Sequence, residues 1–227
     1  MTLRFAATFA LLSLLNAQQR PASPAKSHNV MIDNAYVRVV RAMNVPGQKS
    51  RMHKHDINRV MVHLDAGTMR LAHEGGKVDD IVFKPGDVRW DPAGGLHTSE
   101  NIGGTQYHII EIELKQPGAG TPVAWPGLDP VKTDPAHHKI EFENDQVRVI
   151  RQRVGVKETS AMHEHVLPRV TVYLSEQKAY TAVARNRGSA FFNEAGKVSW
   201  GERARHSERN TGTEPFEVIL VEIKPVR

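Results

Sequence analysis

The stretch Met52-His-Lys-His55 decides how this chain is organised, because it returns as Met162-His-Glu-His165. The shift between the two copies is 162 − 52 = 110 residues. Residues i and i+2 of a β-strand face the same side of the sheet. If each copy lies on a strand, its two imidazoles can converge on one point.

Flanking segments repeat at the same shift. Residues 34–41 match residues 144–151, and the pair Arg59-Val60 matches Arg169-Val170. After a one-residue deletion, His97 matches His206. A collinear series of this length indicates that one unit has been duplicated.

The chain divides into four segments on this basis. The two copies span residues 26–115 and 136–225, and residues 116–135 are rich in proline and glycine, which predicts an extended, stiff linker. Residues 1–17 have a basic start followed by an apolar run, the pattern of a secretory signal peptide, and the run is too short to span a bilayer. We therefore expect a secreted or periplasmic protein.

Composition excludes several classes of protein. The 227 residues include no cysteine, which rules out disulfides, thiolate ligands and cysteine nucleophiles. The net charge of +5 comes from basic residues scattered among acidic ones, so nucleic-acid binding is not expected. No segment after the signal is apolar enough for a membrane span.

The local pattern predicts an all-β fold. Short runs rich in β-branched residues, such as residues 60–64 and 108–114, alternate with turn signals such as Gly75-Gly76. Helical periodicity is absent outside the N-terminal run. Evenly spaced short strands of this kind are typical of a sandwich or barrel.

Histidines supply the candidate site. Of the twelve in the chain, six form two matched sets: His53, His55, His97 and His163, His165, His206. Three neutral imidazoles suit a divalent transition metal such as Fe, Mn, Ni or Zn and leave positions open for other ligands. The alternative is that the histidines are inherited from the ancestral unit and bind no metal.

At these residues the chain resembles the cupin superfamily. Gly47 followed by His53 and His55 fits the first cupin motif, and the second motif is matched by Gly86, Pro92, Gly94, His97 and Asn101. The resemblance covers both copies. It implies two tandem double-stranded β-helix (jelly-roll) barrels, each with a metal in its mouth.

The chain departs from the family pattern in ways that matter. The motif glutamate is absent, and Arg59 and Arg169 stand near its place. If Arg59 keeps the parity of the histidines, it faces the lumen and favours a bound anion; otherwise it reaches solvent at a strand edge. The second copy is more degenerate, since Lys157 replaces Gly47.

Three functions stay open at this point. The resemblance implies a metal-dependent enzyme, for instance a three-histidine dioxygenase, with Arg59, His63 and Arg169 as candidate substrate-binding residues. The second option is a non-catalytic periplasmic protein that binds a small molecule. The third is a structural bicupin, and the sequence neither supports nor excludes a homo-oligomer.

Overall fold

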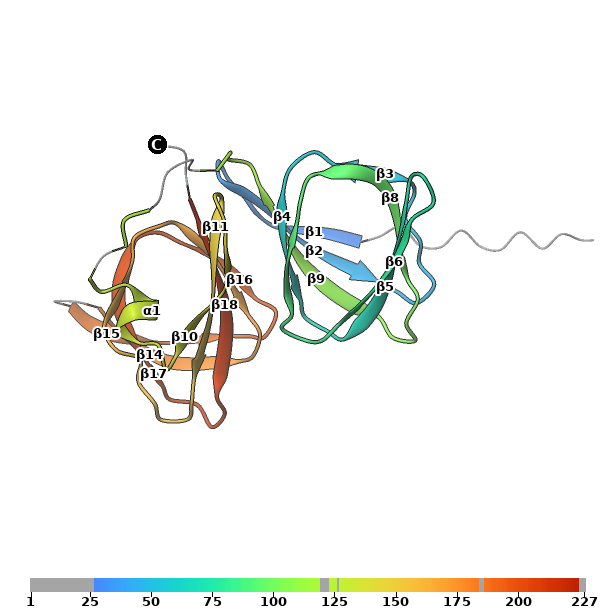
Figure 1. Cartoon of the computed structure of the whole chain (residues 1–227). Helices are drawn as coiled ribbons and strands as arrows, with labels where there is room; N and C mark the ends of the chain where they lie inside the picture. Colours follow the sequence, from blue (N-terminus) through green and yellow to red (C-terminus); the bar gives the residue numbers. More distant parts are fainter. Residues whose placement is uncertain (1–26, 119–122, 126, 184–185, 225–227) are drawn as a thin grey trace, which may run out of the picture.

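The structure is a computed structural model that describes residues 27–118, 123–125, 127–183 and 186–224. In this part of the chain, strands build two units that lie side by side, and we call each unit a barrel (Figure 1). The predicted signal peptide, residues 1–17, lies outside the described residues. No helix in the described part combines the length and apolar character of a membrane span.

The N-terminal barrel consists of two antiparallel sheets. One has the strand order β1-β2-β9-β4-β7 and the other the order β3-β8-β5-β6. Its strands are β1 (Ser27–Asp33), β2 (Val37–Asn44), β3 (His53–His55), β4 (Arg59–His63), β5 (Gly67–His73), β6 (Val78–Phe83), β7 (Val88–Asp91), β8 (Gly94–Asn101) and β9 (Tyr107–Leu114).

The C-terminal barrel repeats this design strand for strand. Its sheets have the orders β10-β11-β18-β13-β16 and β12-β17-β14-β15. Its strands are β10 (His138–Glu143), β11 (Val147–Val154), β12 (His163–His165), β13 (Arg169–Tyr173), β14 (Gln177–Val183), β15 (Asn186–Asn193), β16 (Val198–Gly201), β17 (Ala204–Asn210) and β18 (Phe216–Ile223). The predicted all-β fold is confirmed.

Each five-stranded sheet is covered on both faces, as β4 illustrates. Val60 and Val62 point out of the barrel and belong to an apolar cluster shared with the other barrel. Arg59 and Met61 alternate with them and line a cavity inside the barrel. Because side chains alternate along a strand, one strand contributes side chains both to the cluster between the barrels and to the lumen.

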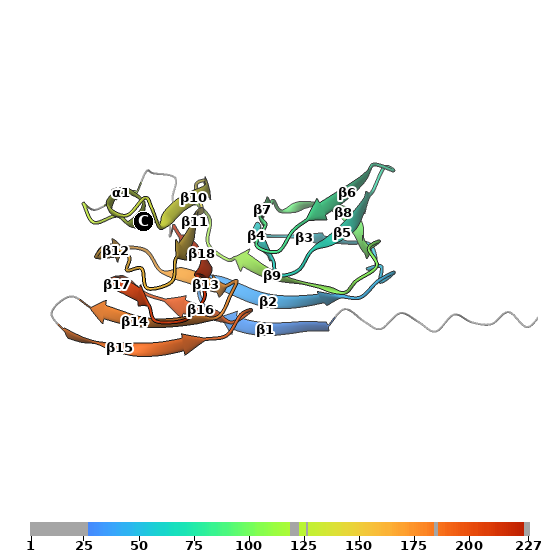
Figure 2. The same ribbon diagram turned by 90° about the horizontal axis from the view of Figure 1, so that it is seen from below.

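The largest apolar cluster lies between the two barrels, and we call it the seam. Aromatic rings close it: Tyr36 stacks on Trp200 with ring centroids 5.5 Å apart, and Trp90 meets Phe142 edge-on. The buried members of the seam are Val37, Val39, Val60, Val62, Ile110, Ile112, Leu114, Val147, Val149, Val170, Val172, Ile219, Val221 and Ile223. The two copies therefore share one apolar core. Figure 2 shows how β1 of the N-terminal barrel runs beside β16 of the C-terminal barrel.

One element corrects the sequence analysis, which expects no helix outside the N-terminal run. Helix α1 (Pro130–Thr133) lies inside the predicted linker, with Pro130 in its first turn. The Asp129 side chain caps it by accepting a hydrogen bond from the Lys132 backbone amide. A single turn is too short to produce a periodic apolar pattern, so periodicity misses it.

The turn that precedes each His-x-His strand needs a left-handed backbone. Gly47 takes φ 71° in the first copy, and Lys157 takes φ 64° at the matched place in the second. Such a φ costs an L-residue roughly 1–2 kcal/mol. The duplicated turn geometry has therefore been kept although the glycine has been lost.

Replacing Lys157 by glycine is expected to stabilise the protein. We predict that Lys157→Gly raises the free energy of unfolding by about 0.5–1 kcal/mol, because glycine removes the strain but adds some freedom to the unfolded chain. Urea denaturation measures the change. Lys157→Ala is the control, since it removes the same long side chain but keeps the Cβ; a gain from alanine equal to that from glycine would contradict the strain argument.

Candidate functional site

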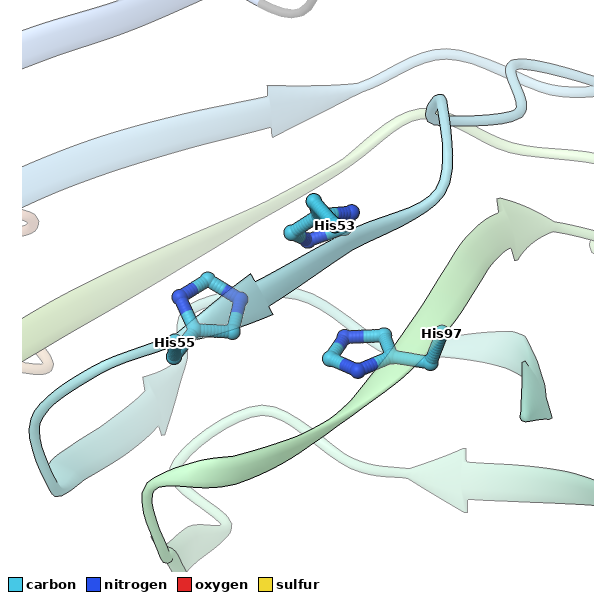
Figure 3. A group of neighbouring side chains, drawn as sticks. All are labelled: His53, His55 and His97. Carbon is cyan, nitrogen blue, oxygen red and sulfur yellow. The ribbon is translucent and has the colours of Figure 1, made fainter. Parts of the chain in front are cut away.

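The first three histidines meet at one end of the N-terminal barrel. His53 and His55 lie on β3, and His97 lies on β8 directly opposite His53 in the antiparallel register. Their ring centroids are 4.6–5.5 Å apart. One ligand atom from each ring lies within 4.8 Å of the other two, and Figure 3 shows the rings turned toward a common space.

Hydrogen bonds decide which ring nitrogen is available in two of these side chains. His53 Nδ1 donates to the Arg51 carbonyl at 2.8 Å, and His97 Nδ1 donates to the Gly95 carbonyl at 3.0 Å. A carbonyl oxygen can only accept, so each Nδ1 carries the proton and each Nε2 keeps its lone pair. This arrangement orients an imidazole to bind a metal through Nε2.

Two of the three rings, those of His55 and His97, are held in the neutral form by their surroundings. Burial, followed by the positive charge of Arg59, lowers the pKa of His55 to about 4. Burial also lowers the pKa of His97. Neutral imidazole is the ligand form, so these two rings do not have to lose protons before they bind a cation.

Arg59 faces the lumen, as strand parity suggests, but it has partners there. Its guanidinium is buried, pairs with Asp91, and contacts Glu111 Oε2 at 2.8 Å. Asp91 also contacts Arg89 at 3.3 Å. Two acids and two bases therefore neutralise one another, and the arginine neither repels a metal strongly nor offers an unpaired charge to an anion.

The triad opens into a cavity of about 270 Å³. Its apolar wall is formed by Met61, Met69, Leu71 and Ile109, and its polar part by the histidines with Arg59, Asp91 and Glu111. This volume is just below the range of roughly 300–1,000 Å³ typical of small-molecule pockets.

His63 does not line this cavity, although it was a candidate substrate-binding residue. Its Nδ1 lies 3.1 Å from the Asp87 carbonyl oxygen, and its ring packs on Phe83. Four residues of strand separate it from Arg59, a distance of about 13 Å along β4. Strand parity correctly places His63 on the inner face of β4, but it does not indicate how far along the barrel the side chain lies.

The second triad has the same geometry and deeper burial. His163 and His165 on β12 and His206 on β17 have ring centroids 4.7–5.4 Å apart. His163 and His165 are almost completely buried, whereas His53 and His55 are only partly buried. Burial lowers the pKa of His206 to about 3.

A carboxylate orients one ring of the second triad. His165 Nδ1 lies 2.8 Å from Glu222 Oε1, and Arg148 lies 3.8 Å from the other oxygen of Glu222. A carboxylate behind an imidazole fixes its orientation and raises its basicity as a ligand. In the first barrel the matched pair, Arg38 and Glu113, contact each other.

The predicted linker covers the second site. Trp125 stacks on the Arg148 guanidinium at 4.0 Å, and Arg148 pairs with Asp129. The Glu164 amide donates to the Leu128 carbonyl at 2.8 Å. Residues 123–125 and 127–134 thus form what we call the cover, with α1 lying over the C-terminal barrel (Figure 1). An extended linker was predicted; its second half instead packs on the barrel.

Arg169 differs from Arg59 in its partners. It is buried and donates to the Glu202 carbonyl at 2.7 Å, but among the described residues no carboxylate lies within ion-pair distance of it and its Nε has no hydrogen-bond partner. It lines a cavity of about 180 Å³ with polar neighbours that include Gln152, Tyr173 and Glu208. Burial raises the pKa of Glu208.

Sequence reasoning missed several residues of the two sites. Asp91 and Glu111, which neutralise Arg59, have no acidic counterparts in the second copy, so the repeat gave no signal for them. The repeat does contain a signal for a fourth matched pair of histidines, because His28 and His138 stand 138 − 28 = 110 residues apart. His28 lines the first cavity, and His138 packs against His163.

Comparisons with known proteins identify the fold. No family model and no curated protein match the sequence. The structure is similar to AerE from Microcystis aeruginosa, with a TM-score of 0.65 and 11% identity over 90% of this chain and 95% of that one. It is also similar to a cupin 2 conserved barrel domain protein from Leptotrichia buccalis, with a TM-score of 0.56 and 12% identity over 91% and 92%.

A third similar structure is oxalate decarboxylase from Bacillus subtilis, described with Mn(II) centres. Its TM-score is 0.59, with 15% identity over 85% of this chain and 70% of that one. Identities this low establish the fold alone. The chain has the cupin fold in two copies, which confirms the fold that its motifs imply.

The buried histidines make the metal-free protein sensitive to acid. His55, His138 and His206 have pKa values of about 4, 4 and 3 in the folded protein, below the unfolded value of about 6.5. At pH values between the folded and unfolded pKa, the folded protein therefore binds fewer protons at these residues than the unfolded chain does. Glu222 opposes this with a pKa raised by burial to about 7. Three histidines against one glutamate leave the unfolded chain with about two more protons near pH 5.

Stability in the presence of a chelator is therefore expected to rise with pH across this window and to fall as pH drops from about 6.5 to about 4. Urea denaturation at about pH 5 and about pH 7, with EDTA present, measures it. Equal or greater stability at the lower pH would show that these rings are not held neutral by burial.

Proposed function

We propose that this two-cupin chain is an exported metal-binding protein whose N-terminal barrel is the chamber for a small, oxygen-rich substrate. The observation that carries the proposal is the convergence of three imidazoles in each barrel. In the first barrel, two of them have Nδ1 tied to a backbone carbonyl and Nε2 left free. Export rests on the signal pattern of residues 1–17.

The donor set fits a divalent transition metal. Three imidazole nitrogens suit Fe, Mn, Ni and Zn, and none of these ions requires a thiolate, which this chain cannot supply. His53, His55 and His97 would hold the ion in the first barrel. Such an ion would supply Lewis acidity toward substrate oxygens and, for Fe or Mn, redox chemistry with O₂.

The residues of the chamber determine what can bind beside the ion. Met61, Met69 and Ile109 give it an apolar wall that accepts a hydrocarbon portion. Asp91 and Glu111 are paired with Arg59, and Asp91 also with Arg89, so the chamber has no unpaired positive charge to attract a highly charged anion. The chamber therefore fits a partly apolar molecule with adjacent oxygens, the kind of substrate on which dioxygenase-like enzymes act.

Metal content tests this proposal. The protein reconstituted with Fe, Mn, Ni or Zn and then desalted is expected to carry about two ions per chain. His97→Ala should remove one ion, because a set of two imidazoles binds far more weakly than three. His73→Ala is the matched control, since His73 lies opposite His97 on β5 and pairs with Asp79. Metal content near zero for every ion would overturn the proposal.

A specific observation favours a second candidate function, the binding of a small anion without catalysis. Arg169 is buried with its Nε unpartnered among the described residues, in a polar cavity. A buried arginine of this kind favours a planar oxyanion that it can bind with two hydrogen bonds. Oxalate or malonate would have the right charge and size class.

Thermal shift in the presence of a chelator separates the two functions. If the C-terminal lumen binds anions, oxalate or malonate should raise Tm, and Arg169→Gln should abolish the rise. Arg59→Gln serves as the comparison, because Arg59 is already paired and its loss should leave the anion effect intact. No shift with either anion at millimolar concentration would remove anion binding as a function.

A further inference from the structure

A fourth imidazole stands beside the second triad. His138 on β10 is almost completely buried. Its cross-strand partner on β11 is Gln152, which lines the lumen, and direct cross-strand partners share a face of the sheet. The His138 ring meets the His163 ring at a centroid distance of 4.6 Å and an angle of 64°. The side chain of His138, the first residue of β10, therefore points into the site.

The hydrogen bonds of this ring leave one nitrogen without a partner. His138 Nδ1 donates to the Asp134 carbonyl at 3.2 Å, just as His163 Nδ1 donates to the Ala161 carbonyl at 2.8 Å. Both Nε2 atoms are buried, and among the described residues neither has a hydrogen-bond partner. Two buried lone pairs therefore lie in adjacent rings, and leaving each of them without a partner destabilises the fold. A bound cation satisfies both at once.

The cover builds this arrangement and distinguishes the two barrels. Asp134, the C-cap of α1, holds His138 through its carbonyl and receives the Ala161 amide on its side chain. Ala161 lies just before β12, so this hydrogen bond links the cover to the strand of His163. The matched histidine of the first barrel, His28, is exposed at the edge of an open cavity. Only the second barrel encloses its fourth ring.

We propose that His138 is a fourth imidazole ligand of the C-terminal site, which makes it a closed centre of four nitrogens. The inference rests on the proposed function, since it assumes that the triad His163, His165 and His206 binds a metal. The two sites then differ in function. The first site keeps coordination positions on its ion open for substrate, whereas the second site holds its ion with no open coordination position.

Cobalt(II) binding tests the proposal in a background that lacks the first site. The double variant His53→Ala/His97→Ala leaves only the C-terminal site, and Co²⁺ reports coordination through the intensity of its visible absorption. The background is expected to bind one Co²⁺ with the intense spectrum of a four-coordinate ion. Adding His138→Gln should lower affinity in a chelator competition by more than the roughly 10–100-fold that loss of an outer partner costs, and should weaken the absorption.

Two further variants keep the result interpretable. His137→Gln is the matched control: His137 is the adjacent residue and pairs with Asp134 and Glu158, so its loss should leave the cobalt spectrum unchanged. His138→Gly leaves space for an imidazole, and imidazole added to the buffer should restore affinity and spectrum. Rescue by added imidazole distinguishes a lost ligand from a damaged fold.

The possible failures are distinct. If the background binds Co²⁺ and His138→Gln changes neither affinity nor spectrum, the fourth ligand is wrong while metal binding stands. A fall within the 10–100-fold range, with the spectrum unchanged, also overturns direct ligation. If the background binds no Co²⁺ at all, metal binding by the C-terminal triad is wrong and this inference falls with it.

Discussion

The packing of two five-stranded sheets against each other is the interaction on which the rest of the structure depends. The outward faces of both sheets form the seam, the largest apolar cluster of the described residues. Alternation along each strand then leaves the inward faces free for other side chains. Because the seam supplies a shared apolar core, each lumen can hold charged and polar groups, such as Arg59 with its two acids or Arg169 with Glu208, without leaving the fold short of apolar burial.

Two copies of one unit have diverged inside this common frame. The turn, the His-x-His strand and the third histidine are retained in both, even where Lys157 must adopt the backbone of a glycine. The surroundings have changed. One triad opens into a cavity with an apolar wall, and the other lies under the cover, with Glu222 behind His165 and His138 beside His163. Duplication followed by this divergence separates an accessible site from a protected one.

The sequence predicts the fold and the two triads because repetition and strand parity are local properties. A shift of 110 residues identifies the units, and parity brings His53 and His55 to one face. Position along a strand is not encoded this way, so His63 was assigned to a chamber that it does not reach. The partners of Arg59 also escaped prediction, since Asp91 and Glu111 come from distant strands whose register only the folded sheet sets. The cover was missed because its helix is a single turn.

The most direct test of this account is a crystal structure of the protein reconstituted with manganese or iron, with anomalous scattering recorded at the metal edge. The account predicts one anomalous peak at each triad, bonded to Nε2 of His53 and His97 in the first barrel and of His163 in the second. Bond lengths should be near 2.0–2.2 Å, as for imidazole ligands in general. Ordered metal elsewhere on the molecule, with both triads free of anomalous density, would contradict the claim that these histidines form metal sites.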